Sequence, residues 1–478
     1  MSADGVVSLP RKRHRRARLI ATGLVLAVAT AVGTPILFNA TAVGAGYFAK
    51  QLCSEVFVAG RSAKWVVDTD LSYFFPALLM NVARWTIDAG TVRASFLGIG
   101  TRVARFRADA GCVLDPMDED ADAPRAPMPI TVTEPLNQEE AASPLPWVLA
   151  ATPNERIKAI VQGAFIESNE RSSVPGRTRA IFIVHDGRVI AEHYADGFNA
   201  STRLPGWSIA KSLTHAMVGL LVADGRIELE GTLPLPEWRK DERRSITWDQ
   251  MLRMTSGLAF NETYSNPFSD INQMLWATAD ISRFAAAMPL AASPGSTWRY
   301  TSGTTNVLTR AMRAVLADAD GNDRKAPVRA LFERIGMTSA LMERDATGNL
   351  VGSSFVYATA ADYARFGWLY AMDGMWDGTR VLPAGWVQHA MQPSVGSDGR
   401  YGAHFWLDVP PDDRHYFGET VPAMLHASGF GGQWISILPA ERLVIVRLGQ
   451  ALSRTAWNHW AFVAAVREAI ATRGEPPR

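Results

Sequence analysis

The sequence predicts an α/β sandwich, in which an antiparallel sheet is flanked by N-terminal and C-terminal helices and carries a large inserted helical region. Three observations support this fold class. An amphipathic helix and a β-hairpin occupy residues 157–194. A mostly helical stretch with Gly and Pro breaks follows, over residues 201–400. Strand patterns then return at residues 401–407, 434–438 and 443–448, ahead of a last amphipathic helix at 457–472.

The first helix and the hairpin have the clearest patterns. Five apolar residues fall on one helical face: Ile157, Ile160, Val161, Ala164 and Phe165. Two apolar runs, 180–185 and 188–194, are then separated by Asp186-Gly187. An Asp-Gly pair between such runs is typical of a type I′ turn, which needs positive φ at both central residues. The two runs are therefore expected to pair as neighbouring antiparallel strands.

The composition sets the scale and excludes one class of partner. The chain has 478 residues, of which 47% are hydrophobic, enough for one large domain and a smaller accessory region. The 48 Lys and Arg residues nearly balance the 47 Asp and Glu residues. A net charge of +1 gives no global field that would draw the protein to nucleic acid. Only seven basic residues are Lys, so a Lys at a special position has added weight.

The N-terminus has the pattern of a membrane anchor. A basic segment at residues 11–18 precedes an uncharged apolar run at 19–38, long enough for a helix to cross a hydrocarbon core of ~30 Å. The positive-inside rule keeps residues 1–18 in the cytoplasm and exports everything after an anchor at 19–40. We therefore expect a single-pass inner-membrane protein whose main domain is periplasmic. A cleaved signal peptide, with Ala40-Thr41-Ala42 as its cleavage site, is the alternative. A basic nucleic-acid-binding arm is disfavoured, because such arms do not lead directly into a long apolar run.

The two cysteines, Cys53 and Cys112, belong to no Cys-x-x-Cys pair and to no Cys/His spacing of a metal site. In an exported protein, two isolated cysteines can form one disulfide. Two buried thiols are the alternative. No His, Asp and Glu grouping has the spacing of a zinc site, and no Gly-rich phosphate loop occurs, so we expect neither a metal nor a cofactor.

Residues 46–112 are interpreted as a small accessory segment. Within it, residues 91–107 alternate with period two on either side of Leu97-Gly98 and predict a hairpin. Residues 113–147 contain an acidic run and several prolines and cannot bury much apolar surface, so they are expected to form an extended linker. The main domain is then expected over residues 148–474.

Residues 205–225 predict a helix with a serine at its start. Pro205-Gly206 breaks the preceding structure, and Gly225 suits the helix end, where a left-handed residue is common. Lys211 follows Ser208 by three positions, which brings the two side chains to about 5–6 Å at Cβ. A buried lysine has a lowered pKa and can act as the base that takes a serine proton. The positive end of the helix dipole also favours the charge that develops during attack.

Ser-x-x-Lys alone is a weak motif, because a helix cap followed by a surface lysine has the same spacing. Here it occurs once in the chain, and the residues after it are strongly apolar, as in a core helix. A second element supports it. Pro294-Gly295 leads into Tyr300-Thr301-Ser302, and a phenol beside a lysine can relay a proton to a leaving group. A tyrosine on an ordinary loop is the alternative.

Together these residues resemble the serine β-lactamase and penicillin-binding-protein superfamily, in its class C-like branch, and within it the esterases and 6-aminohexanoate-oligomer hydrolases. The likeness keeps the family's motif order over roughly residues 150–474 and implies the β-lactamase/transpeptidase-like fold. The matching stretches are residues 207–212, 246–252 with 254–258, 294–295 with 300–302, 358–367, 401–402 with 405–406, and 429–433.

The resemblance implies a role for each matching residue. Ser208 would be the acylated nucleophile, Lys211 its base partner and Tyr300 the proton relay. Ser302 would help to hold the proton network. Tyr264, in Tyr264-Ser265-Asn266, is interpreted as lining the cleft, with a surface loop as the alternative.

The third family element departs from the pattern. The family has Lys or His, then Thr or Ser, then Gly, whereas this chain has Ala427-Ser428-Gly429, with His426 one position early. A slip of one position turns a strand side chain to the opposite face, although a one-residue bulge could restore it. A lost charge-assisted bond to a substrate carboxylate typically costs ~1.5–3 kcal/mol. The resemblance still implies that the Phe430 backbone N–H is an oxyanion donor, worth ~2.7–4 kcal/mol in the transition state.

These patterns lead to an expected function and its alternatives. We expect a serine hydrolase that cleaves a small ester or amide through an acyl-enzyme on Ser208. A penicillin-binding or cell-wall peptidase or β-lactamase-type protein is the first alternative, and a non-enzymatic binding protein with a decayed site is the weaker second one. His215, four residues after Lys211, is expected to pack in the core rather than act in the site.

Overall fold

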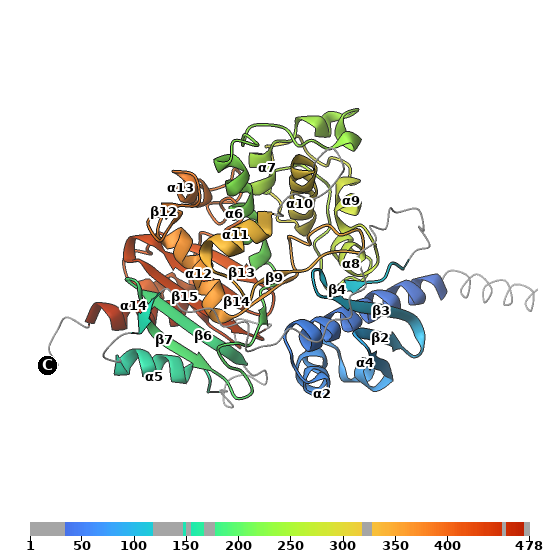
Figure 1. The fold of residues 1–478 in the computed structure, drawn as a ribbon, viewed down its shortest axis with the longest axis horizontal. Coiled ribbons are helices and arrows are strands. Elements are labelled where there is room, and N and C mark those ends of the chain that lie inside the picture. Colours follow the sequence, from blue (N-terminus) through green and yellow to red (C-terminus); the bar gives the residue numbers. More distant parts are fainter. Residues whose placement is uncertain are drawn as a thin grey trace, which may run out of the picture.

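The computed structural model describes residues 34–117, 147–149, 154–166, 177–317, 327–451 and 456–472. Figure 1 shows two parts: an N-terminal region (residues 34–117), drawn in blue, and a larger main region (residues 147–472). The predicted linker at 113–147 lies mostly outside the described residues. The predicted division into domains at 46–112 and 148–474 stays a prediction.

A six-stranded sheet is the centre of the described main region, and its strands lie in the order β13-β14-β15-β6-β7-β5. β5 runs parallel to β7, and every other neighbouring pair is antiparallel. The predicted hairpin is confirmed, since β6 and β7 pair across Asp186 and Gly187, whose φ angles are 50° and 72°. The strands are β5 (Val148–Leu149), β6 (Thr178–His185), β7 (Arg188–Tyr194), β13 (Leu425–Gly429), β14 (Gln433–Leu438) and β15 (Leu443–Gly449).

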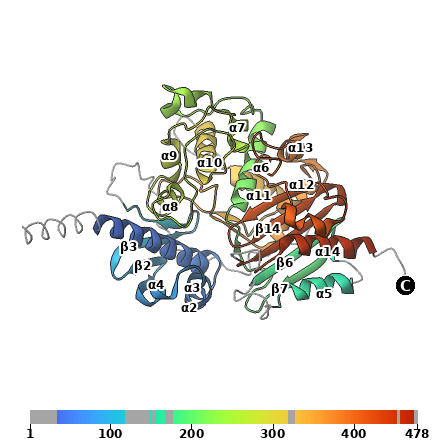
Figure 2. The ribbon, with the colours of Figure 1, turned by 180° about the vertical axis from the view of Figure 1, so that it is seen from behind.

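Helices cover both faces of this sheet (Figures 1 and 2). On one face, Ile181 and Ile183 of β6 pack with α5 (Glu155–Gly163) and α14 (His459–Ala471). On the other face, Phe182 and Val184 join the core built by α6 (Ile209–Ala223) and α12 (Ala360–Ala371). This alternation is what a strand buried on both faces requires. The α/β sandwich predicted from the sequence is therefore correct.

The long insertion between β7 and β13 is helical, as predicted (Figure 1). Its helices, besides α6 and α12, are α7 (Trp248–Leu252), α8 (Asp270–Trp276), α9 (Ile281–Ala286), α10 (Ser302–Leu316), α11 (Pro327–Ile335) and α13 (Trp386–Met391). It also carries short strands, namely β8 (Leu204–Pro205), β9 (Leu341–Met342), β10 (Val356–Ala358), β11 (Met375–Trp376) and β12 (Thr379–Arg380).

The strand predicted at residues 401–407 is wrong. Tyr401 forms a single antiparallel bridge with Trp406, so the chain reverses direction between them. His404, inside this reversal, has a φ of 56°. The aromatic rings of this turn, Tyr401 and Trp406, pack against Tyr300 and against each other, so the stretch is apolar without being a strand.

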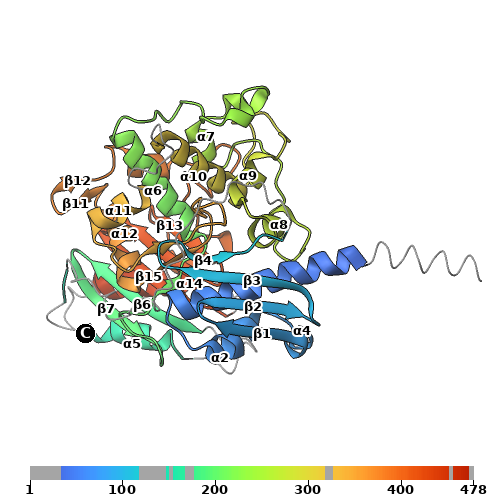
Figure 3. The same ribbon diagram turned by 45° about the vertical axis from the view of Figure 1, so that its right-hand side comes forward.

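The N-terminal region pairs a long helix with its own antiparallel sheet, ordered β1-β2-β3-β4 (Figure 3). The helix covers residues 34–53, and the predicted hairpin is confirmed as β2 and β3. A disulfide between Cys53 and Cys112 joins the helix end to β4, as the sequence allowed. The remaining elements are η1 (Ser54–Val58), α2 (Ala63–Val66), η2 (Val67–Leu71), α3 (Ser72–Phe74), α4 (Ala77–Val82), β1 (Ala83–Asp88), β2 (Thr91–Phe96), β3 (Ile99–Arg107) and β4 (Gly111–Leu114).

The predicted transmembrane anchor is not supported. Across the described residues, no helix combines the length and apolarity needed to span a membrane. Residues 1–33, with most of the predicted span, lie outside the described residues. The described end of that span, residues 34–40, opens the helix 34–53. The buried apolar residues of this helix, such as Ala42, Ala45 and Phe48, come after the span. Without a supported anchor, the expected single-pass inner-membrane placement with a periplasmic catalytic domain is not supported either.

Candidate active site

Ser208 lies at the N-terminus of α6, held there by a strained turn. The N–H of Gly206 donates to the carbonyl of Val356 in β10, at 2.8 Å. Trp207 then adopts a left-handed φ of 50°, which costs a non-glycine residue about 1–3 kcal/mol. Its ring is fixed by the rings of Tyr47, Phe355 and Phe430, at centroid distances of 6.3, 6.4 and 5.5 Å. The turn thus places Ser208 directly before the first residue of α6.

The Ser208 hydroxyl does not cap its own helix, although it occupies the N-cap position. A serine in this position usually accepts from a backbone N–H in the first turn. Here the Ser208 Oγ lies 3.0 Å from Lys211 Nζ instead. The predicted proximity of the two side chains is therefore confirmed, and the hydroxyl faces a basic nitrogen.

Lys211 is buried among neutral acceptors. Its side chain is 1% exposed, and its Nζ contacts Ser208 Oγ, Ser302 Oγ at 3.1 Å and the carbonyl of Ser353 at 2.9 Å. Desolvation lowers the pKa of Lys211 to about 8, partly opposed by the negative charge of Glu262. A substantial fraction of the amine is then neutral near pH 8, which the ordinary lysine pKa would not allow.

The three acceptors also orient the amine. A neutral lysine has two N–H groups and one lone pair. If the N–H groups point to Ser302 Oγ and to the Ser353 carbonyl, the lone pair points to Ser208. The same nitrogen can therefore accept the Ser208 proton and hold it with three hydrogen bonds as an ammonium.

Tyr300 lies on the other side of Lys211. The Lys211 Nζ is 4.9 Å from the centre of the Tyr300 ring. The ring stacks on Trp406 at 5.5 Å. Burial and the nearby charge of Glu262 raise the pKa of Tyr300, while hydrogen bonding to Ser208 acts in the opposite direction. Tyr300 is thus a neutral phenol that can donate or pass on a proton beside Ser208.

Glu262 organises the polar network around this pair, and no sequence pattern pointed to it. Its carboxylate accepts from Ser302 Oγ at 2.5 Å and from the Ser302 N–H at 2.9 Å. Ser302 is the first residue of α10, capped by Thr301, whose hydroxyl accepts from the N–H of Thr304. Tyr264 donates from its hydroxyl to Glu262 at 2.7 Å. Ser302 therefore links Lys211 to a carboxylate without letting them form an ion pair.

Tyr264 lies on an exposed loop, and its role in lining the cleft stays a prediction. Its side chain is 48% exposed on a loop. Its ring nevertheless lies 6.3 Å from that of Phe430. Burial of the phenol and the charge of Glu262 raise the pKa of Tyr264, so it stays protonated.

The strand β13 runs past the nucleophile turn. A Cβ at Gly429 would lie 2.0 Å from the carbonyl oxygen of Gly206, so only glycine allows this approach. Ser428 is half-buried beside it, and Phe430 follows at the strand end with its ring on Trp207. The predicted stretch 428–430 is thus brought next to Ser208.

His426 faces away from the site. β13 pairs with β14 in unbroken register, so no bulge moves the histidine by one position. His426 is fully buried, and its Nδ1 lies 2.9 Å from Ser436 Oγ. Ala427, on the other face, belongs to the core around α6. The position where the family has a cation is therefore apolar here.

Other buried histidines support the framework. His215 packs in the core as predicted, with Nδ1 2.7 Å from the Tyr370 hydroxyl and Nε2 3.2 Å from His389. His404, which the sequence did not single out, has its Nδ1 3.0 Å from the carbonyl of Lys211. Burial lowers the pKa of His404 to about 3, so the ring is neutral and can donate to that carbonyl. Among the described residues, no group of three or more His, Cys, Asp or Glu side chains could hold a metal.

Comparisons with known proteins give a family match and a shared fold. The model of the family described as Beta-lactamase matches residues 165–460. The 6-aminohexanoate-dimer hydrolase of Paenarthrobacter ureafaciens is 27% identical over 229 residues, which are 45% of this chain and 57% of that protein. The match therefore spans little more than half the length of that relative.

Solved structures share the fold. A Bacillus anthracis protein provisionally assigned as a 6-aminohexanoate-dimer hydrolase has a TM-score of 0.54 at 21% identity, covering 71% of this chain and 90% of its own. A penicillin-binding protein homologue from Caulobacter crescentus has a TM-score of 0.51 at 16% identity, covering 68% of this chain and all of its own. At these identities the likeness is one of fold.

Proposed function

Because this chain belongs to the β-lactamase family, a family of hydrolases, we propose that it is a serine hydrolase acting through an acyl-enzyme on Ser208. One observation carries the proposal. Lys211, with its pKa lowered to about 8, holds its Nζ 3.0 Å from the Ser208 hydroxyl and contacts only neutral acceptors. An activated serine needs such a base within hydrogen-bond reach.

The proposed reaction has two halves. Ser208 Oγ attacks the substrate carbonyl carbon while its proton moves to Lys211 Nζ. Tyr300 then donates a proton to the leaving amine or alkoxide as the C–N or C–O bond breaks, and Lys211 restores the phenol. Water enters and attacks the acyl-enzyme with the same groups in reverse roles, which releases a carboxylic acid and returns Ser208 to its starting state.

Charge on the carbonyl oxygen requires donors. The N–H groups of Ser208 and Phe430 are proposed for this role, since α6 directs its positive end to the site and β13 runs beside it. Each such donor is typically worth about 2.7–4 kcal/mol in the transition state.

The walls of the site favour an uncharged acyl group. Ala427 stands where the family has a cation, and the rings of Trp207, Tyr264 and Phe430 gather beside Ser208. A carboxylate at that point would gain no charge-assisted bond. The matched relative is named a 6-aminohexanoate-dimer hydrolase, and a bond between the amino group of one such unit and the carboxyl group of the next is an amide. A site that expels an amine can also expel the alcohol of an ester. A small, uncharged ester or amide is therefore the proposed substrate class.

A serine-reactive fluorophosphonate probe tests the nucleophile. We expect the wild-type protein to be labelled at Ser208 and Ser208→Ala to remain unlabelled. Hydrolysis of p-nitrophenyl butyrate and of a short amide oligomer should disappear in the same variant. Equal labelling of both proteins would remove Ser208 from the mechanism.

Penicillin binding is the second candidate, because the matching family is the β-lactamase family. Nitrocefin turnover and a fluorescent penicillin measure it directly. We expect slow or no acylation by either compound, since Ala427 offers no partner to their carboxylate. Rapid stable labelling by the penicillin would instead favour a cell-wall role over ester or amide hydrolysis.

A further inference from the structure

We infer that Glu343 is a positioning residue for the hydrolysis proposed above, and this inference rests on that proposed function. Glu343 lies in the main region between β9 and β10, outside every matched motif. The N-terminal region fixes the carboxylate of Glu343. The backbone of Glu343 fixes residues 343–356, here called the bracket segment, which contact both Lys211 and the nucleophile turn.

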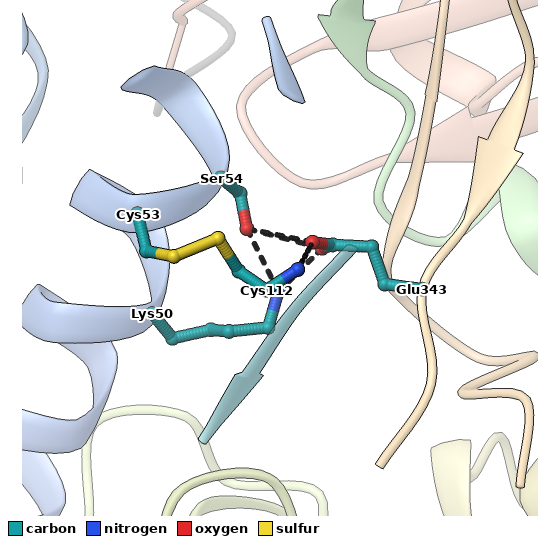
Figure 4. The surroundings of a disulfide bond; sticks show 5 residues. All are labelled: Lys50, Cys53, Ser54, Cys112 and Glu343. Atoms are coloured by element: carbon teal, nitrogen blue, oxygen red, sulfur yellow. Dashed lines mark hydrogen bonds and ion pairs between the residues drawn. A yellow bond between two sulfur atoms is a disulfide. The ribbon is translucent and has the colours of Figure 1, made fainter. Parts of the chain in front are cut away.

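The carboxylate of Glu343 is fully buried, and the partners that hold it come from the N-terminal region (Figure 4). It forms an ion pair with Lys50. It accepts from Ser54 Oγ at 2.9 Å and 3.1 Å, and from the N–H of Cys112 at 2.7 Å. Removing one partner from this set would leave a buried charge uncompensated, which is costly. These contacts therefore fix the position of the Glu343 carboxylate.

The disulfide ties these partners together. Ser54 follows Cys53 directly and Lys50 lies one helical turn earlier, so the bond joins the helix that supplies both to the strand that supplies the Cys112 amide. The start of β4 packs closely against Glu343. A Cβ at Gly111 would lie 2.5 Å from Glu343 Cγ, and the N–H of Arg344 donates to the carbonyl of Ala110 at 2.9 Å.

Two backbone bonds connect Glu343 to the site. Its N–H donates to the carbonyl of Phe355 at 2.7 Å, and its carbonyl accepts from the N–H of Val351 at 3.0 Å. These bonds close a loop around Ser353, whose carbonyl accepts from Lys211 Nζ at 2.9 Å. The carbonyl of Val356 accepts from Gly206, two residues before Ser208. The bracket segment thus holds both members of the Ser208–Lys211 pair.

Phe355 provides a second connection. Its ring lies 4.1 Å below the Lys50 ammonium and 6.4 Å from the ring of Trp207. Trp207 has the left-handed backbone that directs Ser208 into the site. A shift of Glu343 would therefore disturb the acceptor of Lys211 and the support of the nucleophile turn together.

Glu343→Gln is the primary test, since it keeps the size of the side chain and removes its charge. We expect kcat for p-nitrophenyl butyrate to fall about tenfold or more while KM stays within about twofold, because a small misplacement of catalytic groups acts on the chemical step. We also expect the acid limb of kcat to move to lower pH, because the Lys211 ammonium loses the Ser353 carbonyl as an acceptor. Cys53→Ser/Cys112→Ser leaves the Glu343 charge in place and should show the same changes to a smaller extent.

Val463→Ala is the matched control for stability. Val463 is fully buried in the core between α14 and the sheet, away from the bracket segment. We expect it to lower Tm with kcat and the acid limb unchanged. All variants are assayed well below Tm, with folding checked by circular dichroism.

The inference is overturned if folded Glu343→Gln behaves like Val463→Ala, with lower Tm but wild-type kcat and acid limb. If Glu343→Gln does not fold, the cysteine variant is judged by the same two readouts, and wild-type values there overturn the inference as well. A wild-type protein that reacts with neither probe nor ester overturns the proposed function itself, and the inference with it.

Discussion

Lys50 and Lys211 are both buried in the protein, yet their surroundings differ in one respect. Their side chains are 2% and 1% exposed, and desolvation lowers the pKa of both. Lys50 forms an ion pair with Glu343, whereas Lys211 contacts two hydroxyls and a carbonyl. In the second case the nearest carboxylate, Glu262, is reached only through Ser302.

This difference separates a structural lysine from a reactive one. A carboxylate in contact keeps an ammonium charged, and the pair then fixes two elements against each other. Neutral acceptors satisfy the geometry of the amine without stabilising its charge to the same extent, so the proton can leave. The pKa of about 8 for Lys211 means that the neutral, basic amine becomes more abundant as pH rises through 8.

Removing Lys211 should have the largest effect on activity. We expect Lys211→Met to lower kcat/KM by about 10³-fold, since general-base catalysis contributes about 10²–10⁴-fold. Its free energy of unfolding should change little, because no ion pair is broken. Steady-state kinetics and urea denaturation check the two statements. Retention of more than about a tenth of the activity would mean that another base serves Ser208.

Removing Lys50 should have its largest effect on stability, with a smaller loss of kcat than in Lys211→Met because Glu343 holds the bracket segment. We expect Lys50→Met to lower the free energy of unfolding by about 3–5 kcal/mol, because Glu343 is left buried without a counter-ion. Urea denaturation measures the loss. Lys50→Met/Glu343→Leu is the matched control and should recover most of it, since the uncompensated charge is gone. Additive losses in the double variant would contradict a charge-pair origin.

Tyr300→Phe removes the phenol hydroxyl, keeps the ring and therefore tests the proposed proton relay. We expect amide hydrolysis to fall about 10²-fold. The loss on p-nitrophenyl butyrate should be much smaller, because p-nitrophenolate leaves without a proton. The ratio of the two losses is the measurement. Equal losses on both substrates would contradict proton donation to the leaving group, and wild-type activity on both would leave Tyr300 only its ring packing against Trp406 and Tyr401, which Phe keeps.

Glu262→Gln should give the smallest change in rate and a diagnostic change in pH dependence. The negative charge of Glu262 raises the pKa of Lys211, so its removal should lower that pKa further. The acid limb of kcat/KM, expected near pH 8, should therefore move to lower pH, with the maximal rate reduced about tenfold or less by the loss of the Ser302 contact. A limb that moves to higher pH would contradict the assignment of that limb to Lys211.

The sequence predicted those features that depend on neighbours along the chain. Ser208 and Lys211 share one helical turn, and Asp186-Gly187 sets its own hairpin, so spacing and turn chemistry suffice for both. Glu262 and the Ser353 carbonyl reach Lys211 only through the fold, and a carbonyl is common to every residue type, so neither leaves a sequence signal. The position of Tyr300 beside Lys211 followed from family resemblance, since 89 residues separate the two.

The errors have equally specific causes. Hydropathy at residues 19–40 measures a preference for burial and does not state what covers the surface. Of this run the structure describes residues 34–40, where Ile36, Leu37 and Phe38 are about half exposed. At residues 401–407, a run of apolar and aromatic residues predicted a strand, whereas Tyr401 and Trp406 face each other across a reversal of the chain.

The pairing of β6 with β15 has a consequence for how the protein reaches its native state. These strands are neighbours in the middle of the sheet, yet more than half of the chain lies between them. During synthesis, β6 and β7 emerge early, and one edge of their hairpin has no partner until β15 leaves the ribosome. Such long-range closure is slow, and an open apolar edge invites pairing with other chains. Expression at low temperature or with a holdase chaperone should therefore raise the yield of folded protein more than any change at the active site.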